Sequence, residues 1–430
     1  MIRKGSVVRC LTLLAVAAVH PESQVLAQTR APAAVVIRAA RMLDVEKGTM
    51  VSPAVVVVAG DRITAVNPAA APAGARTLDL GDVTLMPGFI DLHTHLTLDI
   101  EPGWQYQPVE WTAADYALRG ARNAVPTLRA GFTTVRDVGS KGFSDVALMN
   151  AIDKGDLVGP RIVPSAYAIG ATGGHCDDTG FIPGVLEEGP DEGVADGPEE
   201  LVKAVRYQIK HGAKVIKICA TAGVLSFEGP VGAQQLSDAE MKAVVDEAKM
   251  HGVRVAAHAH GTEGIIAASR AGVTSVEHAS FLTDEAIAEL KRNGTWAVFT
   301  LYLSQTIDTA SLPPALRVKA RIATTAADES FRRAVKAGVK IGFGTDAAVV
   351  PHGQNAHEFA TRVQLGQSPI EALRGATLYA AQVLGVDDRG IIQAGRLADL
   401  VAMPGNPLTD ITVTEKVSWV MKGGTVVEMR

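Results

Sequence analysis

A pair of histidines one residue apart follows an apolar run early in the chain. Residues 85–92 are mostly apolar, and His93 and His95 come next, separated by one threonine. Successive side chains of a β-strand point to opposite faces, so the two imidazoles are expected on one face. Two neutral nitrogen donors on one rigid strand suit Zn²⁺ or a similar metal ion. The alternative is a pair of surface histidines at a strand end, and further ligands at downstream strand ends would favour the metal.

Such side chains do stand where later predicted strands give way to loops. The fifth predicted strand leads into His258 and His260, the sixth into His278, and the eighth into Asp346. In barrel folds the carboxyl ends of the strands carry the catalytic groups. Each residue alone is a weak indication of a site, whereas the set at several strand ends is a strong one.

Lys217 adds an unusual group to this set. It lies in the predicted strand 213–219, where alternation puts it on the face opposite Ile216 and Ile218. If the isoleucines face a helix layer, the lysine faces the interior, where an uncompensated ammonium is costly. An amine that reacts with CO₂ becomes a carbamate, an anion that can bridge two cations. The alternatives are a lysine that reaches solvent and one that pairs with a carboxylate.

These residues require a fold that gathers many strand ends. Helix-compatible stretches repeatedly end on a glycine and lead into an apolar strand, at Gly131, Gly212, Gly252, Gly272, Gly294 and Gly338. Counting from the first histidine pair, the predicted strands are 84–92, 133–136, 161–168, 213–219, 253–257, 273–277, 295–300 and 339–344. Eight parallel strands with helices between them predict an α/β protein with a (β/α)₈ TIM barrel.

Shorter strand-like segments stand at both ends of the chain, at residues 34–38, 54–58, 397–403 and 418–421. We therefore expect the two ends to join into one small β-sandwich domain. The predicted domains are a signal peptide at 1–27, the two parts of the sandwich at 28–84 and 386–430, and the metal-dependent barrel at 85–385.

The first residues resemble a cleavable secretory signal. Arg3, Lys4 and Arg9 precede the apolar run 10–19, and small residues follow near position 27. The run is too short to span a bilayer. A periplasmic or secreted protein is therefore expected, with a cytoplasmic protein carrying an N-terminal extension as the alternative. An intact Met1 in the native protein would contradict export.

Composition limits the classes of partner. The chain has 430 residues, 47% of them hydrophobic, and a formal net charge of −5 without a long basic run. This balance disfavours nucleic-acid and anionic-membrane partners and suits a globular enzyme acting on a small molecule, for which we expect a homo-oligomer. Only Cys176 and Cys219 would remain after signal cleavage. Two cysteines so far apart in sequence do not form a disulfide framework, so the fold is expected to rest on its core and its metals.

The metal-binding residues resemble, residue by residue, the ligand set of the binuclear amidohydrolase superfamily with a carboxylated lysine. That set comprises His93, His95, Lys217, His258, His278 and Asp346, and residues 86–95 resemble the family's first-strand signature. Residues 172–175, 217–224 and 257–261 are similar to the branch of Xaa-Pro and Xaa-Arg metallo-dipeptidases, which also contains ochratoxin A amidohydrolases. The resemblance covers nearly all of the chain after the signal region.

The resemblance implies a cofactor and a mechanism. His93, His95 and Asp346 would hold one Zn²⁺ or similar ion, His258 and His278 a second, and N6-carboxylated Lys217 would bridge the two. Two cations that share a water lower its pKa and polarise the scissile carbonyl. Asp346 would accept the proton of the attacking water and return it to the leaving nitrogen.

Four further residues are candidates for binding a substrate carboxylate or carbonyl: His175, His260, Tyr302 and Arg136. Structural roles remain open for each of them, and a salt bridge to Asp137 is the default for Arg136. Aromatic residues cluster after the first barrel strand, at Trp104, Tyr106 and Trp111, where they would suit a bulky apolar group.

The expected reaction is hydrolysis of N-acyl or aminoacyl amino acids with a free carboxylate, ochratoxin A among the candidates. Hydrolysis of a cyclic amide or imidazolone is the enzymatic alternative. A non-catalytic relative would be expected to lose ligands, and this chain keeps all six.

Overall fold

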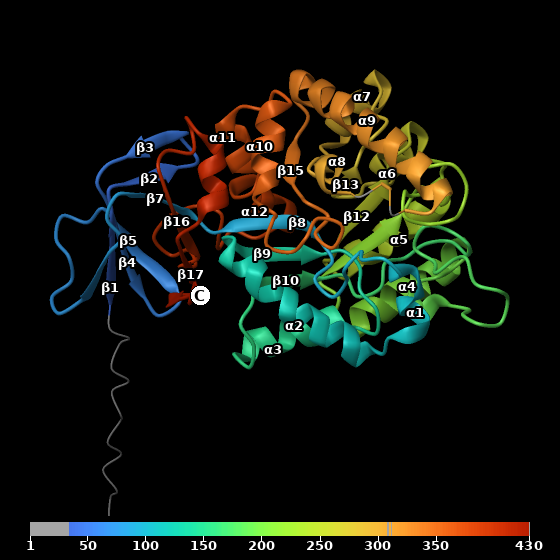
Figure 1. Cartoon of the computed structure of the whole chain (residues 1–430), viewed down its shortest axis with the longest axis horizontal. Coiled ribbons are helices and arrows are strands. Elements are labelled where there is room, and N and C mark those ends of the chain that lie inside the picture. Colours follow the sequence, from blue (N-terminus) through green and yellow to red (C-terminus); the bar gives the residue numbers. More distant parts are fainter. Residues whose placement is uncertain (1–33, 308, 311, 430) are drawn as a thin grey trace, which may run out of the picture. The chain divides into compact units, whose positions relative to one another are not determined.

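Eight strands in the middle of the chain form the centre of the structure, and helices lie outside them (Figure 1). The computed structural model describes residues 34–307, 309–310 and 312–429, so the predicted signal peptide and residues 28–33 lie outside the described residues. The central strands are β8 (Phe89–Thr94), β9 (Phe132–Asp137), β10 (Arg161–Pro164), β11 (Val215–Cys219), β12 (Arg254–Ala259), β13 (Ser275–His278), β14 (Trp296–Phe299) and β15 (Ile341–Phe343).

All eight strands run parallel and close into a barrel. Neighbours pair in the orders β8-β9-β10 and β11-β12-β13-β14-β15. Short parallel bridges join the two groups: the Ile169 N–H donates to the Lys217 carbonyl at 2.8 Å, and the Asp346 N–H donates to the His93 carbonyl at 2.8 Å. The predicted (β/α)₈ barrel is therefore confirmed, and every strand delivers its carboxyl end to the same face.

The connecting segments supply the helical layer. Its main helices are α2 (Ala113–Arg129), α3 (Ser144–Lys154), α4 (Gly197–Lys210), α5 (Asp238–Met250), α6 (Thr262–Ala271), α7 (Asp284–Asn293), α9 (Pro314–Ala337), α10 (His357–Gln364), α11 (Pro369–Gly375) and α12 (Leu378–Leu384). Two short helices, α1 (Gln107–Glu110) and α8 (Leu303–Thr306), stand in loops near the strand ends. Among the described residues, no helix combines the length and the apolar character that crossing a membrane requires.

Alternation along β11 explains how the barrel is filled. Ile216 and Ile218 are fully buried in one cluster with Val205 of α4 and Val244 of α5. Lys217 therefore points the other way, into the barrel, and is only 3% exposed.

Two further sheets lie outside the barrel, the first built from N-terminal strands alone and the second from both ends of the chain. One has the order β5-β4-β1-β6 and the other the order β18-β17-β16-β7-β2-β3. Buried Ile37 and Val56 of the first sheet share one cluster with Leu85 and Leu400 of the second, so the sheets form the predicted sandwich. The strands are β1 (Val35–Ala39), β2 (Arg41–Asp44), β3 (Thr49–Val51), β4 (Ala54–Ala59), β5 (Arg62–Val66), β6 (Arg76–Asp79), β7 (Val83–Pro87), β16 (Leu400–Pro404), β17 (Trp419–Lys422) and β18 (Thr425–Val426).

The predicted strand 84–92 is wrong in one respect, because the structure divides it at Gly88. β7 pairs with β16 in the sandwich, while β8 begins at Phe89 and pairs with β9 in the barrel. A Cβ atom at Gly88 would lie 2.1 Å from Oγ1 of Thr133, so no side chain fits at this crossing. The boundary predicted between residues 84 and 85 consequently falls inside β7. The third predicted strand, 161–168, is also shorter than expected and ends at Pro164.

The expectation about the cysteines is wrong. Cys176 and Cys219 form a disulfide across 43 residues of sequence. The segment after β10 folds back onto the end of β11 and brings the two Cα atoms to 5.8 Å, within the range that a disulfide spans. The sequence does not predict that the two cysteines lie close together, because their proximity arises only from the packing of adjacent barrel strands.

Candidate metal centre

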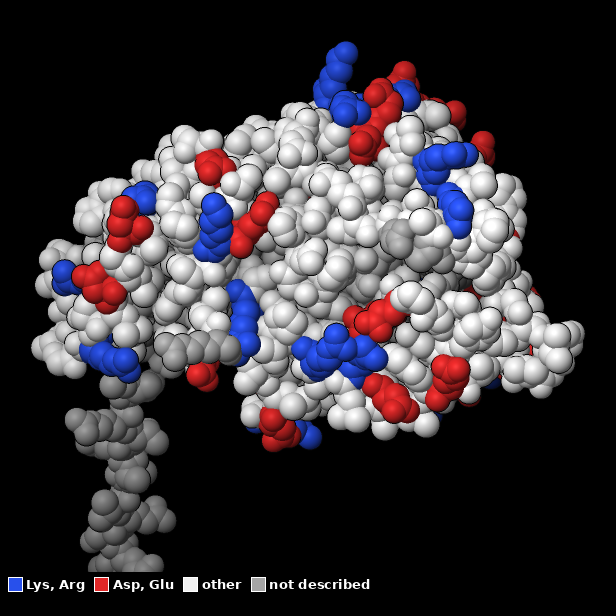
Figure 2. Space-filling view, in the orientation of Figure 1, with Lys and Arg blue, Asp and Glu red and all other residues white. Residues whose placement is uncertain are grey.

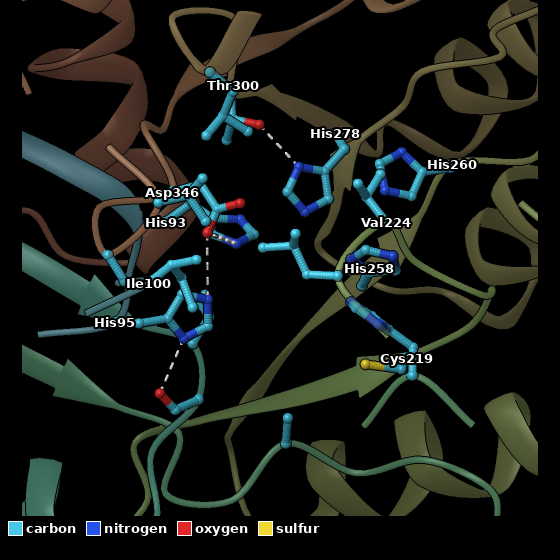
Figure 3. Close-up of a pocket in the computed structure, with 18 of the residues that line it drawn as sticks. His93, His95, Ile100, Cys219, Val224, His258, His260, His278, Thr300 and Asp346 are labelled. Atoms are coloured by element: carbon cyan, nitrogen blue, oxygen red, sulfur yellow. Dashed lines mark hydrogen bonds and ion pairs between the residues drawn. The ribbon is translucent and has the colours of Figure 1, made fainter. Parts of the chain in front are cut away.

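A cavity of about 280 Å³ opens at the carboxyl ends of the barrel strands. All six residues predicted as metal ligands line it: His93, His95, Lys217, His258, His278 and Asp346. Figure 3 shows His93, His95 and Asp346 on one side of this space and His258, His260 and His278 on the other. The barrel thus brings together donors that span more than half of the sequence.

The donor atoms form two adjoining groups. Oδ1 of Asp346 lies 3.6 Å from Nε2 of His93 and 3.5 Å from Nε2 of His95. One set of ligand atoms within 4.8 Å of one another belongs to His93, His278 and Asp346, and a second belongs to His258, His260 and His278. His260 therefore stands as close to the second group as the predicted ligands do.

Hydrogen bonds fix the orientation of the imidazole rings. Nδ1 of His93 donates to Glu277 at 3.0 Å, and Nδ1 of His95 donates to the Gly139 carbonyl at 2.9 Å. Nδ1 of His278 is bonded to the Thr300 hydroxyl and Nδ1 of His260 to the Ser280 hydroxyl, both at 2.8 Å. Such partners leave Nε2 free to bind a metal ion.

Among the histidines of the two donor groups, one buried ring nitrogen has no hydrogen-bond partner in the described part of the chain. Nε2 of His258 is buried and makes no hydrogen bond. A buried polar atom without a partner is unfavourable, and its lone pair would be satisfied by a cation. The donor set therefore fits a divalent metal.

Burial sets the protonation states in the cavity. It lowers the pKa of His95 to about 4 and the pKa of His260 to about 3, so these imidazoles are neutral, as metal ligands must be. Burial also lowers the pKa of Lys217 to about 8, although the carboxylates of Glu277 and Asp346 act in the opposite direction. The pKa of Asp346 is raised to about 6, again chiefly by burial.

Two of the predicted metal ligands have strained backbones. His278 has φ 70° and Asp346 has φ 62°, the left-handed region that residues other than glycine rarely adopt. Each such residue costs on the order of 1–3 kcal/mol and persists where the surrounding structure enforces it. Both strained residues are predicted metal ligands, and this coincidence favours a functional role for the orientation of their side chains.

Comparison with known proteins identifies the family. Residues 84–427 match the Amidohydrolase family. The chain belongs to the amidohydrolase family. This amidohydrolase is 35% identical over 366 residues to the ochratoxinase of Aspergillus niger, covering 79% of this chain and 75% of that protein. It is a hydrolase that acts on amide bonds, and members of its family are generally metal-dependent.

Solved structures give the same family. The chain is 36% identical in sequence to a Xaa-Pro dipeptidase whose crystal structure has methionine bound in the active site. The two structures have a TM-score of 0.88, and the match covers 92% of this chain and 100% of that chain. A prolidase complexed with N-methylphosphonate-L-proline is 33% identical, with a TM-score of 0.86 and the same two coverages.

Of the four substrate-binding candidates in this amidohydrolase, two line the cavity. The ring of His175 lies 4.2 Å from that of His258 between centroids, and its Nδ1 is bonded to the Ser226 hydroxyl. His260 lines the same space. Tyr302 does not, because its ring stacks on His357 at 5.0 Å.

The prediction that Arg136 binds substrate is wrong. The salt bridge expected between Arg136 and Asp137 is also wrong, because Arg136 pairs with Glu277 instead. Its side chain is 2% exposed and lies inside the barrel, where it donates to Glu277 at 2.8 Å and to Ser275 at 2.9 Å. Glu277, which is fully buried, in turn accepts from His93. Arg136 therefore holds the carboxylate that orients His93, and Arg136 itself does not line the cavity.

Sequence reasoning missed Glu277 and Asp91 as supporting residues. Asp91 accepts hydrogen bonds from the Thr345 hydroxyl at 2.6 Å and from Asn355 at 2.8 Å, which ties β8 to the segment carrying Asp346. Glu277 directly precedes His278, and strict alternation would put only one of the two inside the barrel. The positive φ of His278 lets both reach the site, and no sequence signal predicts it.

Replacing Arg136 with methionine is expected to lower the free energy of unfolding by about 3–5 kcal/mol, because the Glu277 carboxylate would remain buried without its partner. Denaturant unfolding measures the change. The matched control is Arg333→Met, which breaks an exposed pair with Asp284 and should cost no more than about 1 kcal/mol. A rise in KM for free-acid substrates alone, without loss of stability, would restore Arg136 as a carboxylate-binding residue.

Proposed function

We propose that this amidohydrolase hydrolyses the amide bond of N-acyl or aminoacyl amino acids with a free carboxylate, using two zinc or similar divalent ions bridged by carboxylated Lys217. Ochratoxin A is among the candidate substrates. The observation that carries the proposal is one cavity that combines six metal-binding side chains with an apolar wall. The ochratoxinase and the dipeptidases to which the chain is similar support the same class of bond.

The residues divide into two groups. His93, His95 and Asp346 would hold one ion, and His258 and His278 the other, with His260 within reach of the second. Once bound, the ions would supply Lewis acidity to the scissile carbonyl and to a water. Asp346 lies beside both histidines of the first group and accepts the proton of the attacking water, then returns it to the leaving nitrogen.

Lys217 is suited to carboxylation. Its pKa, lowered to about 8, leaves about a tenth of the amine neutral at pH 7, which is far more than in an ordinary lysine, and only the neutral amine attacks CO₂. The nitrogen forms a bond to the carbon of CO₂ and loses one proton, which leaves an anion where the two groups of ligands meet. This anion would replace a buried cation that its surroundings disfavour.

The remaining walls fit an apolar group. Trp104, Val224, Leu225 and Ile307 form one apolar cluster with Leu316, and the first four line the cavity. Tyr106, by contrast, is exposed, and Trp111 packs on Tyr116. The apolar wall supports a bulky acyl group or side chain, while His175 and His260 are the candidate donors for the carboxylate or the carbonyl.

A substrate panel tests the proposal. The zinc-loaded enzyme is assayed with N-acyl-phenylalanine, aminoacyl-proline and aminoacyl-arginine, and with the matching C-terminal amides. Free acids should be cleaved roughly tenfold faster or more, because an amide leaves the buried donors of the site without a charged partner. Equal rates for acids and amides would contradict carboxylate recognition, and turnover of cyclic amides alone would favour the imidazolone-type reaction.

A further inference from the structure

The disulfide lies in the wall of the metal cavity. Cys176 and Cys219 both line it. Cys219 is the last residue of β11 and stands two positions after Lys217, while Cys176 directly follows His175. Figure 3 shows Cys219 just below His258. The bond therefore joins the strand that carries the proposed bridging lysine to the loop that carries His175.

The loop is attached to Cys219 at both ends. The Cys219 N–H donates to the Ile169 carbonyl at 2.8 Å, just before the loop begins, and the Cys219 sulfur is bonded to Cys176, just after His175. Residues 170–175 are thus closed onto one residue of the barrel. The closure is tight, because a Cβ atom at Gly170 would lie 2.8 Å from Cβ of Cys176.

The same attachment places the His175 ring. Its backbone N–H donates to Gln235 at 3.0 Å and its Nδ1 is bonded to Ser226 at 2.5 Å, and both partners belong to the segment that follows Cys219. A Cβ atom at Gly223 would lie 2.2 Å from the ring, so the ring fills the space beside that glycine. Among the described residues, these two hydrogen bonds and the disulfide hold His175 and Cys176, and of the three the disulfide is the covalent bond.

We propose that the Cys176–Cys219 disulfide is a positioning element of the active site, which holds His175 over His258 and makes the rate of amide hydrolysis depend on its oxidation. The inference rests on the proposed function in that His175 acts on the amide substrate. Reduction breaks the S–S bond, and each sulfur takes up one electron and one proton. A dithiol reductant such as dithiothreitol supplies both and becomes its cyclic disulfide. Loop 170–175 then keeps its hydrogen bonds and packing contacts but loses its covalent link to β11.

The test compares wild type, Cys176→Ser, Cys219→Ser and the double variant, each also combined with His175→Asn, well below the melting temperature. Loss of the disulfide should lower kcat/KM roughly tenfold or more, because a small misplacement of a group at the site has a large kinetic effect. The two single variants and the double variant should be equally slow, with unchanged metal content. In the His175→Asn background the loss should disappear, since the bond acts through that ring.

Treatment of the wild type with dithiothreitol, followed by its removal under anaerobic conditions and reloading with zinc, should reproduce the slow rate. The double serine variant is the control and should not respond. Full activity in the serine variants, free thiols in the fully active native protein, or an unchanged loss in the His175→Asn background would each overturn the inference.

Failure of the proposed function has a different signature. The oxidised wild type would then cleave none of the amides. Hydrogen exchange of the backbone amides in residues 170–175 does not depend on activity, so it tests the positioning role of the disulfide separately. Faster exchange in this segment after reduction supports the positioning role, and unchanged exchange contradicts it.

Discussion

Replacing Lys217 with alanine is expected to abolish amide hydrolysis, with kcat reduced on the order of 10³-fold or more, because loss of metal-centred stabilisation costs several kcal/mol in the transition state. Lys217 lines the same cavity as both groups of donors, and it is nearly inaccessible to solvent. Alanine leaves the two groups without an anion between them. Steady-state kinetics on the best substrate of the panel measures the loss.

Short carboxylic acids distinguish the bridging role from a structural one. Acetate or propionate can enter the space that the side chain leaves and should restore part of the activity of Lys217→Ala, but not of a misfolded protein. Lys214→Ala is the matched control, since Lys214 is exposed just before the same strand, and it should retain the wild-type rate. Wild-type activity of Lys217→Ala without any added acid would refute the bridge.

Removal of metal with a chelator is expected to reduce activity to below about one hundredth and to lower the melting temperature, because metal that binds only the folded state stabilises that state. The buried Nε2 of His258 and the neutral histidines around it lose their compensating cation. Dialysed enzyme is assayed and melted, and then titrated with zinc.

Activity and melting temperature should recover together near two equivalents of metal per chain. Elemental analysis of the native enzyme supplies the independent count. A fully active enzyme with no more than one ion would contradict the two-metal arrangement while leaving the amidohydrolase family unaffected.

Surface charge agrees with the composition of the chain. On the face shown in Figure 2, basic and acidic side chains are interspersed and form no large basic patch. Many are paired locally, as Arg333 is with Asp284. The sequence alone had indicated this through its net charge and the absence of a long basic run.

The sequence by itself determined the barrel and the set of candidate ligands. Alternation along a strand has a period of two, so Lys217 between Ile216 and Ile218 had to face the interior once the isoleucines faced the helices. The glycines that follow six predicted helices and the polar residues that follow several strands are likewise local signals. Because parallel strands end on one face of a barrel, such signals also imply that distant ligands meet.

Only the tertiary structure decided which interior residues touch. Arg136 reaches Glu277 on a strand across the barrel, and that pairing depends on how far each strand is displaced relative to the others. The Cys176–Cys219 bond depends on a loop folding onto the next strand, and the division at Gly88 depends on a sheet built from both ends of the chain. These features arise from contacts between residues far apart in sequence, which local periodicity and composition do not encode.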